Sequence, residues 1–483
     1  MNTHVFLSAA AFAAVLSTAA RADVVISSDP TQNMSCSAGV CSPTDHQAVL
    51  NVSDLENMLA ASDVTVSTHV YNKNRYAYGI QILAPLSWSS SSELTLTSRY
   101  GGYVRIDAPV SVQGAGGLVI SYNATLANGI PVTFANLGSV FSIFGTTYTL
   151  VGDLPTLASD IAVDPKGSYA LAGDYDASGD QFPKAPIESF SGVLLGLGHT
   201  ISSLTIQKGY KLCEGMIATN SGIVSHLSLS NVTVNLDKNS RYVGGITGCN
   251  LNSLTDVAVS GQVTGNNQSD AGGIAGINFL GTAFARSQAN VSGGEAGGIV
   301  GENDGRISLS SAGGTVNGII NTGGLAGANT NSIALSHATG NVTGSKNNTG
   351  GLVGSNRGDI QNCYALGNVD GGSGAAGGFV GFNGGTVQYA YSTGAVAGSK
   401  KYTGGFAGYD PNEAMATTYW DTDTSGISNP SRGAGFPKYD PGIKGLTTAK
   451  LKSRVPDGFD HRDWRQNAGI NNGYPYLKKN PPQ

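Results

Sequence analysis

The segment Gly244-Gly245-Ile246-Thr247-Gly248-Cys249-Asn250 is the first of seven copies of one pattern. In each copy, two glycines precede two apolar or small residues, a glycine, any residue and an asparagine, and the last copy ends in Asp410 instead. Successive copies start 28, 25, 26, 27, 27 and 27 residues apart. The later copies begin at Gly272, Gly297, Gly323, Gly350, Gly377 and Gly404. Repeats of this length are typical of solenoids, in which each repeat forms one coil of a stack.

The composition and the local pattern favour strands over helices. The chain contains 69 glycines in 483 residues, and glycine destabilises the interior of a helix. Side chains between the glycines alternate in twos, as in Val387-Gln388-Tyr389, which is typical of short strands. A valine lies nineteen residues after the first glycine in each of the first six copies. We therefore predict an all-β fold, a right-handed parallel β-helix.

Stacked coils place equivalent residues ~4.8 Å apart, so two ladders of side chains are expected. The third position of the pattern would form a buried ladder of Ile246, Ile274, Ile299, Leu325, Leu352, Phe379 and Phe406. The seventh position would form a corner ladder of Asn250, Asn278, Asn303, Asn329, Asn356 and Asn383. Asparagine suits a corner because it tolerates left-handed backbone and its amide can bond along the stack.

The remaining segments are assigned from the two ends inward. Residues 1–22 have the apolar run and the small-x-small ending of a secretory signal peptide, although no Lys or Arg precedes the apolar run. Residues 23–63 form an N-terminal cap, whose helix is predicted over Val49 to Ala61, with Ser53 and Glu56 as a capping box. We assign residues 64–122 to narrower coils, 123–213 to a less regular β-rich region, 214–410 to the repeats of about 27 residues, and 411–483 to an irregular C-terminal cap.

Charge and cysteine content limit the partners and the compartment. Charged residues make up 12% of the chain and the net charge is −5, which predicts neither nucleic acid nor an anionic membrane as a partner. No segment is long and apolar enough for an integral membrane span. Cys36 and Cys41 flank Gly39 and are predicted to form a small disulfide loop after export. Cys213, Cys249 and Cys363 fall at different places in the repeat, so we predict buried free thiols.

Two groups of segments resemble known families. Ala84 to Trp88, Leu94 to Leu96 and Ile106 to Val110 resemble secreted adhesins of the filamentous-haemagglutinin type. Phe190 to Ile201, the Gly-Gly repeats and the closing Tyr419 to Gly426 resemble secreted bacterial proteins that carry GLUG-motif repeats. The resemblance implies a secreted, extracellular or cell-surface adhesin-like protein, and we predict neither catalysis nor a cofactor. Its partner would be a host-cell receptor, the extracellular matrix or a glycan. The alternatives are a polysaccharide-degrading β-helix enzyme and a purely structural exoprotein or biofilm component.

Two candidate binding sites lie in the repeats. Arg357-Gly358-Asp359 follows Asn356 and matches the integrin-binding tripeptide of some adhesins, although chance explains it better. Aromatic residues become more frequent toward the C-terminal end, and Tyr364 and Tyr391 share one place on adjacent coils. Facing outward, these two rings would form a stacked strip for sugar or peptide. The alternative, packing beneath the C-terminal cap, is favoured.

Acidic residues suggest two further sites, and neither is favoured. Asp270 and Glu295 lie two residues before a Gly-Gly pair on neighbouring coils, where a close pair could divide acid and base roles. No ladder of basic residues accompanies them, so two exposed loop residues are the better interpretation. The run from Asp174 to Asp180 opens like a calcium loop, but its twelfth position is Ala185 instead of glutamate. With neither His-Glu-x-x-His nor Gly-x-Ser-x-Gly present, we predict no catalytic residues and no metal site.

Overall fold

The computed structural model describes residues 23–68, 77–98, 101–127, 129–209, 211–236, 240–399, 401–437 and 439–482. The predicted signal peptide, residues 1–22, lies outside these ranges. Within them the chain consists mainly of short strands, with three α-helices, α1 (Val52–Leu59), α2 (Leu154–Val163) and α3 (Thr448–Leu451). The chain forms two compact units. The first comprises Met1–Tyr175, Gly192–Ile201 and Val224–Ser228, and the second comprises Asp176–Ser191, Ser202–Ile223 and Leu229–Gln483.

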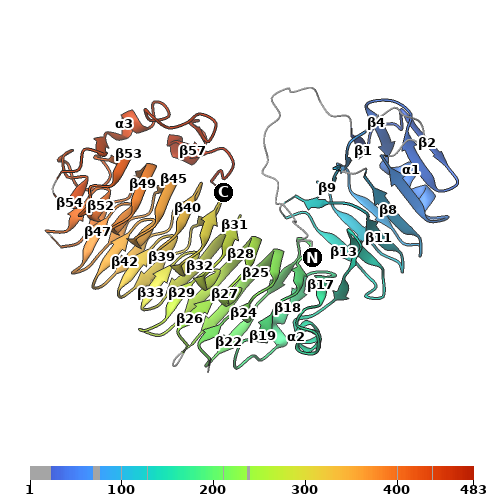
Figure 1. The fold of residues 1–483 in the computed structure, drawn as a ribbon, viewed down its shortest axis with the longest axis horizontal. Helices are drawn as coiled ribbons and strands as arrows, with labels where there is room; N and C mark the ends of the chain where they lie inside the picture. The colour runs from blue at the N-terminus through green and yellow to red at the C-terminus, as the bar shows by residue number, and fades with distance from the viewer. Residues whose placement is uncertain are drawn as a thin grey trace. The chain divides into compact units, whose positions relative to one another are not determined.

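Three mainly parallel sheets surround the core of the first unit (Figure 1). Ile26, Ile82 and Ile106 stack in register on successive coils and are fully buried. One sheet contains β4 (Ala48–Asn51), β1 (Val24–Ser27), β6 (Ile80–Ile82), β9 (Val104–Ile106) and β12 (Ala124–Leu126). The second contains β7 (Leu86–Trp88), β10 (Val110–Val112) and β13 (Val132–Phe134). The third contains β2 (Met34–Ser37), β3 (Val40–Pro43), β5 (Val64–Ser67), β8 (Glu93–Thr97), β11 (Gly117–Ile120), β14 (Phe141–Ile143) and β15 (Thr146–Thr147).

The N-terminal helix is present, but its predicted cap is wrong. Residues up to Asn51 belong to strand β4, and the side chain of Asn51 accepts the backbone N–H groups of Ser53 and Asp54. Glu56 instead accepts the backbone N–H of Ser87 at 2.8 Å, so it ties the helix to the next coil. Helix α2 was not predicted, although Asp153 caps it by accepting the N–H of Thr156 at 2.7 Å.

Three parallel sheets run through the repeats of the second unit, drawn from green to red in Figure 1. The glycine sheet ends its strands at the first pattern glycine and contains β23 (Cys213–Glu214), β26 (Tyr242–Gly244), β29 (Asp270–Gly272), β33 (Glu295–Gly297), β38 (Asn321–Gly323), β43 (Asn348–Gly350), β47 (Ala375–Gly377) and β51 (Thr403–Gly404). The asparagine sheet contains β19 (Ile187–Phe190), β24 (Ile217–Asn220), β27 (Thr247–Asn250), β30 (Ala275–Asn278), β34 (Val300–Asn303), β39 (Ala326–Asn329), β44 (Val353–Asn356), β48 (Val380–Asn383), β52 (Ala407–Tyr409) and β54 (Ala434–Phe436).

The third sheet of the repeats, the broad sheet, has two or three strands in most coils. It contains β28 (Ser253–Thr264), β31 (Gly281–Ala283), β32 (Arg286–Ser292), β35 (Arg306–Ser308), β36 (Ser311–Ala312), β37 (Val316–Gly318), β40 (Ser332–Ala334), β41 (His337–Ala338), β42 (Val342–Gly344), β45 (Asp359–Ala365), β46 (Val369–Asp370), β49 (Thr386–Ser392), β50 (Val396–Ala397), β53 (Met415–Asp421) and β55 (Ile443–Leu446). The strands that precede it in sequence are β16 (Thr149–Val151), β17 (Ser168–Leu171), β18 (Tyr175–Asp176), β20 (Val193–Leu195), β21 (Thr200–Ser202), β22 (Thr205–Gln207) and β25 (Ile223–Asn235).

Both predicted ladders are confirmed. The seven residues of the aliphatic and aromatic ladder, Ile246 to Phe406, are fully buried. Each corner asparagine donates from Nδ2 to Oδ1 of the next one at 2.7–2.8 Å, and Asn383 donates to Asp410 at 2.9 Å. The predicted left-handed backbone of these asparagines is wrong. Positive φ occurs instead on the broad sheet, at Asp256, Phe284, Leu309, Leu335, Asn362, Tyr389 and Thr417.

The pattern glycines allow the glycine and asparagine sheets to lie almost in contact. A Cβ on Gly272 would lie 2.6 Å from the Cα of Val300, which belongs to the next coil and to the other sheet. A side chain at this position would therefore force the two sheets apart. This close approach places a glycine-sheet strand of one coil beside the asparagine-sheet strand of the coil that follows.

Parallel pairing continues beyond Asp410 through β53, β54 and β55. Residues 447–482, the C-terminal tail, include the antiparallel pair β56 (Trp464–Arg465) and β57 (Tyr476–Leu477). The tail runs back over the broad sheet, because Nε1 of Trp464 donates to Asn362 and Nδ2 of Asn480 donates to the carbonyl of Ser310 at 3.0 Å. Figure 1 shows this segment beside strands that lie far earlier in the sequence.

Candidate functional site

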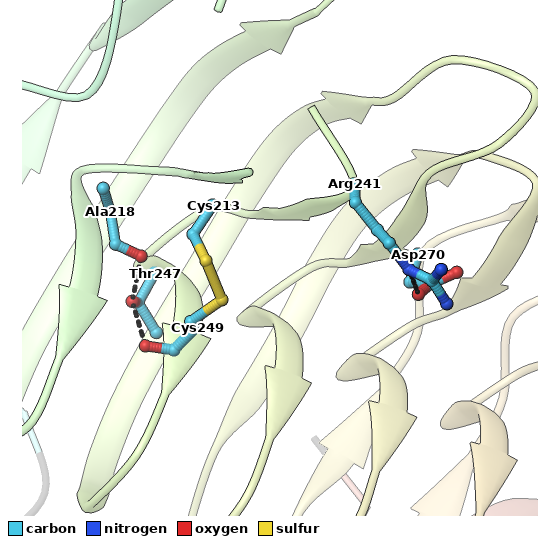
Figure 2. The surroundings of a disulfide bond; sticks show 6 residues. All are labelled: Cys213, Ala218, Arg241, Thr247, Cys249 and Asp270. Carbon is cyan, nitrogen blue, oxygen red and sulfur yellow. Dashed lines mark hydrogen bonds and ion pairs between the residues drawn. A yellow bond between two sulfur atoms is a disulfide. The ribbon is translucent and has the colours of Figure 1, made fainter. Parts of the chain in front are cut away.

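A disulfide bond marks the beginning of the candidate site (Figure 2). Cys213 of the glycine sheet is bonded to Cys249 of the asparagine sheet, one coil further on. The prediction that both were free thiols is wrong. It considered only cysteines at the same position of the repeat, which stack within one sheet, whereas this bond joins different positions on two sheets. Cys363 is free and buried. In the first unit, Cys36 and Cys41 face each other across the antiparallel pair β2–β3 and are joined by a second disulfide.

Cys213 and Cys249 each belong to a row of side chains at equivalent positions on successive coils. The two rows run side by side along the stack, and together we call them the outer strip. The glycine-sheet row is Cys213, Tyr242, Asp270, Glu295, Asn321, Asn348, Ala375 and Tyr402. The asparagine-sheet row is Cys249, Ile277, Glu302, Ala328, Ser355, Phe382, Tyr409 and Phe436. The rows are adjacent at both ends, since Tyr242 packs with Cys249 and Ile277 and the rings of Tyr402 and Tyr409 lie 5.8 Å apart.

One end of the outer strip is acidic. Asp270 and Glu295 are register partners on β29 and β33, which confirms that they stack. They are strand residues and not exposed loop residues, so that part of the prediction is wrong. Asp270 is 5% exposed, and its Oδ2 lies 3.1 Å from Nε of Arg241 (Figure 2). Arg241 covers this carboxylate, which explains its burial.

Burial raises the pKa of the carboxyl groups at this end. For Asp270 the effect of burial exceeds the opposing attraction of Arg241, so its pKa lies above the ordinary value. Burial raises the pKa of Glu295 to about 7, against the opposing hydrogen bond from Nδ2 of Asn321 at 3.0 Å. Burial also raises the pKa of Glu302, and the nearby Asp304 adds to this effect. Glu295 is therefore only partly ionised near neutral pH.

The other end of the outer strip is aromatic. We define the aromatic patch as Phe382, Tyr402, Tyr409 and Phe436. Ring centroids lie 5.6 Å apart for Phe382 and Tyr409, 5.7 Å for Tyr409 and Phe436, and 6.2 Å for Tyr402 and Phe436. Phe436 is 45% exposed and the other three are partly exposed. The patch thus presents a continuous aromatic surface over adjacent coils.

Two exposed cations lie over the aromatic patch. Nζ of Lys401 lies 4.7 Å from the ring centroid of Tyr402 and 5.7 Å from that of Phe436. Cζ of Arg357 lies 5.7 Å from the ring centroid of Phe382. A cation is attracted to the face of an aromatic ring by the ring quadrupole. The patch therefore combines apolar area with positive charge.

Comparison with known families supports the repeat assignment. The family described as "The GLUG motif" matches residues 346–370, which contain the fifth copy of the pattern. The chain carries GLUG-motif repeats. The seven copies from Gly244 to Asp410 are called the GLUG array below.

Two individual proteins are also similar to this chain. Halomucin from Haloquadratum walsbyi is 28% identical over 183 residues, which are 38% of this chain and 2% of halomucin. This chain thus spans a small fraction of that relative. A crystal structure of a candidate immunoglobulin A1 protease from Bacteroides ovatus aligns with 69% of this chain and 93% of its own, at 15% identity and a TM-score of 0.37. Across the described ranges, no helix is sufficiently long and apolar to cross a membrane.

The structure places Tyr364 and Tyr391 away from solvent. Both rings are fully buried and stack 5.3 Å apart, and the ring of His337 extends the stack on the other side of Tyr364. Trp464 and Tyr474 of the C-terminal tail cover them. An outward ligand strip at these two tyrosines is therefore excluded, because the tail occupies the surface in front of them. The favoured interpretation, packing beneath the C-terminal cap, is therefore confirmed. The partly exposed aromatic rings of the repeats lie at other positions.

The Arg357-Gly358-Asp359 tripeptide turns a corner of the GLUG array. Gly358 lies against the backbone of Asn331 on the preceding coil, where a Cβ would collide with it. Arg357 extends over the aromatic patch, whereas Asp359 begins strand β45 of the broad sheet and accepts from Oγ1 of Thr386 at 2.6 Å. The side chain of Arg357 therefore lies over a ring of the asparagine sheet, whereas that of Asp359 belongs to the broad sheet.

The calcium-like run is built as a capped turn. Asp176 caps the short 3-10 helix Ala177–Gly179 by accepting the N–H of Ser178 at 3.1 Å. Asp174 lies 3.2 Å from Nδ1 of His199. In the part of the chain that the structure describes, no three His, Cys, Asp or Glu side chains are grouped as metal ligands.

Proposed function

We propose that this chain is an exported, non-catalytic surface protein that binds an extracellular ligand through the aromatic patch, in an adhesin-like role. One observation carries the proposal, the four partly exposed rings on adjacent coils with two cations over them. Exposed apolar patches on a soluble fold mark sites of interaction, because leaving such area in water is unfavourable.

Export is supported by the cysteines. Four of the five cysteines form disulfides, Cys36 with Cys41 and Cys213 with Cys249. Disulfides persist in oxidising compartments outside the cytosol. The signal-like sequence at residues 1–22 agrees with this location. The two observations together support a location outside the cytosol, at the cell surface or in the extracellular space.

A polysaccharide-degrading enzyme is the second candidate function. The observation that favours it is the acidic end, where Glu295 with a pKa of about 7 lies one strand from Asp270. Two neighbouring carboxyl groups can act as acid and base in glycoside cleavage. The ion pair of Asp270 with Arg241 and its 5% exposure argue against this role, because a nucleophile must reach the substrate.

The two functions are separated by one comparison of variants. The purified chain is applied to an array of glycans and matrix proteins, and each ligand retained is retested with Tyr409→Ala. Phe279→Ala is the matched control, since Phe279 is an aromatic residue of the GLUG array that is 44% exposed outside the patch. Binding should be lost only with Tyr409→Ala. Release of reducing sugars that depends on Glu295 and Asp270 would establish the enzyme instead. A structural exoprotein would show neither result.

A further inference from the structure

The geometry points to an anionic polysaccharide as the ligand of the aromatic patch, bound along the stack with its acidic groups on Arg357 and Lys401. This inference rests on the proposed function and names its ligand class. The acidic groups are carboxylates or sulfates, both of which are oxyanions that accept hydrogen bonds from a cation.

The rings are spaced as a chain molecule would require. Phe382, Tyr409 and Phe436 are register partners on three successive strands, β48, β52 and β54. Coils are ~4.8 Å apart, so the asparagine-sheet row offers one ring per coil in a straight line. Tyr402 widens this line on the glycine-sheet row. Neighbouring rings of this line are tilted by 56° and 52° to each other, so a repeating ligand such as a sugar polymer can place the C–H face of one sugar unit against each aromatic ring in turn.

The charges select an anionic polymer over a neutral one. Among the described residues, neither Arg357 nor Lys401 forms an ion pair with a carboxylate. Both are exposed, and their donors remain available while their positive charge lies over the rings. Hydrogen bonds from a cation to an oxyanion are shorter and stronger than neutral ones. A polymer with an acidic group on its sugars would therefore satisfy both cations while it packs on the rings.

The acidic end limits where such a polymer can lie. Glu302 and Phe382 occupy the same row and are separated by Ala328 and Ser355, so they lie three coils apart. This separation is ~14 Å at the usual strand spacing, which exceeds the Debye length of ~8 Å at physiological ionic strength. The carboxylates of Glu295 and Glu302 therefore do not repel an anionic ligand bound at the patch. A polyanion that extended along the strip to Glu295 and Glu302 would meet like charge there.

The experiment uses polygalacturonate and its methyl-esterified form as probes, because the two polymers have the same sugar backbone and differ in charge. Binding to the whole exported chain is measured by isothermal titration calorimetry at low and at high salt. We expect the wild-type chain to bind the acidic form roughly ten-fold more tightly than the ester. The variants Arg357→Gln and Lys401→Gln should each bind the acidic form roughly ten-fold more weakly than the wild-type chain does. Both side chains are exposed, so these variants should fold. Arg306→Gln, which changes an exposed arginine of the GLUG array outside the patch, is the control and should bind normally.

Other outcomes would overturn the inference in distinguishable ways. Equal binding of the two polymers, lost with Tyr409→Ala but unchanged by both charge variants, would identify a neutral ligand and leave the proposed function intact. Self-association of the chain that Tyr409→Ala abolishes would identify a second copy as the occupant and refute the polysaccharide. Failure of every patch variant to change binding of any ligand on the array would refute both the ligand class and the proposed function.

Discussion

Asp410 ends the corner ladder of amides, and replacing it with asparagine should stabilise the chain in a pH-dependent manner. The carboxyl group is fully buried and accepts from Asn383 at 2.9 Å. Burial, together with the neighbouring Asp440, raises its pKa from the ordinary 3.8 to about 7. Each pKa unit corresponds to ~1.4 kcal/mol, so ionised Asp410 costs the folded state about 4 kcal/mol relative to the protonated form.

The sign of the pH dependence follows from the raised pKa. The folded chain holds the proton more tightly than the unfolded chain, so this contribution favours folding fully below about pH 4 and is lost between about pH 4 and pH 7. The amide introduced by Asp410→Asn would stay neutral throughout and continue the ladder, and its Nδ2 could donate to Asp440. Asp410→Asn should therefore add up to about 4 kcal/mol to the free energy of unfolding at pH 8, and little at pH 4.

Urea unfolding followed by circular dichroism, repeated across this pH range, measures the difference. Asp359→Asn, which changes an exposed aspartate of the same array, is the control and should show no comparable pH dependence. A difference in the free energy of unfolding between wild type and Asp410→Asn that is equal at low and at high pH would refute a raised pKa as the cause. Lower stability of the variant at pH 8 would contradict it as well, because the ionised carboxylate of Asp410 would then stabilise the fold.

Three other changes test the packing of the repeats by thermal or urea unfolding. The double variant Cys213→Ser/Cys249→Ser opens a link across 36 residues and should lower stability by ~3 kcal/mol; an unchanged midpoint in the oxidised and reduced chain would contradict this. Asn329→Leu interrupts the amide ladder on both sides and should cost ~2 kcal/mol or more; Thr330→Ala at the neighbouring corner position is its control and should cost less. Gly272→Val should prevent the glycine and asparagine sheets from closing, and a soluble variant with wild-type melting would show that the sheets can separate there.

The repeated part of the fold could be predicted because the sequence period equals one coil. Once Ile246 and Ile274 are aligned, every position between them is aligned too, and the structure reproduces that register strand by strand. The stacking of Asp270 on Glu295 follows from the same alignment. Their burial does not, because it depends on Arg241 and on the adjoining sheet.

The features that sequence reasoning missed depend on contacts outside this period. The bond between Cys213 and Cys249 joins unlike positions because two sheets lie against each other. The aromatic patch arises in the same way, from a row of each sheet. Left-handed corners escaped detection because Leu309 and Tyr389 carry no sequence signature of that conformation. Helix α2 is the exception, because Asp153 and Pro155 signal it locally as cap and first-turn residues.

The return of the C-terminal tail over the broad sheet changes how the GLUG array can unravel. In a simple solenoid each coil is held by its two neighbours, so the terminal coil can detach first and the rest can follow one by one. Here Asn480 is bonded to Ser310, 170 residues earlier, and Trp464 is bonded to Asn362. Detaching the last coils requires the tail to release first, so the C-terminal half of the array is held as a single cooperative block.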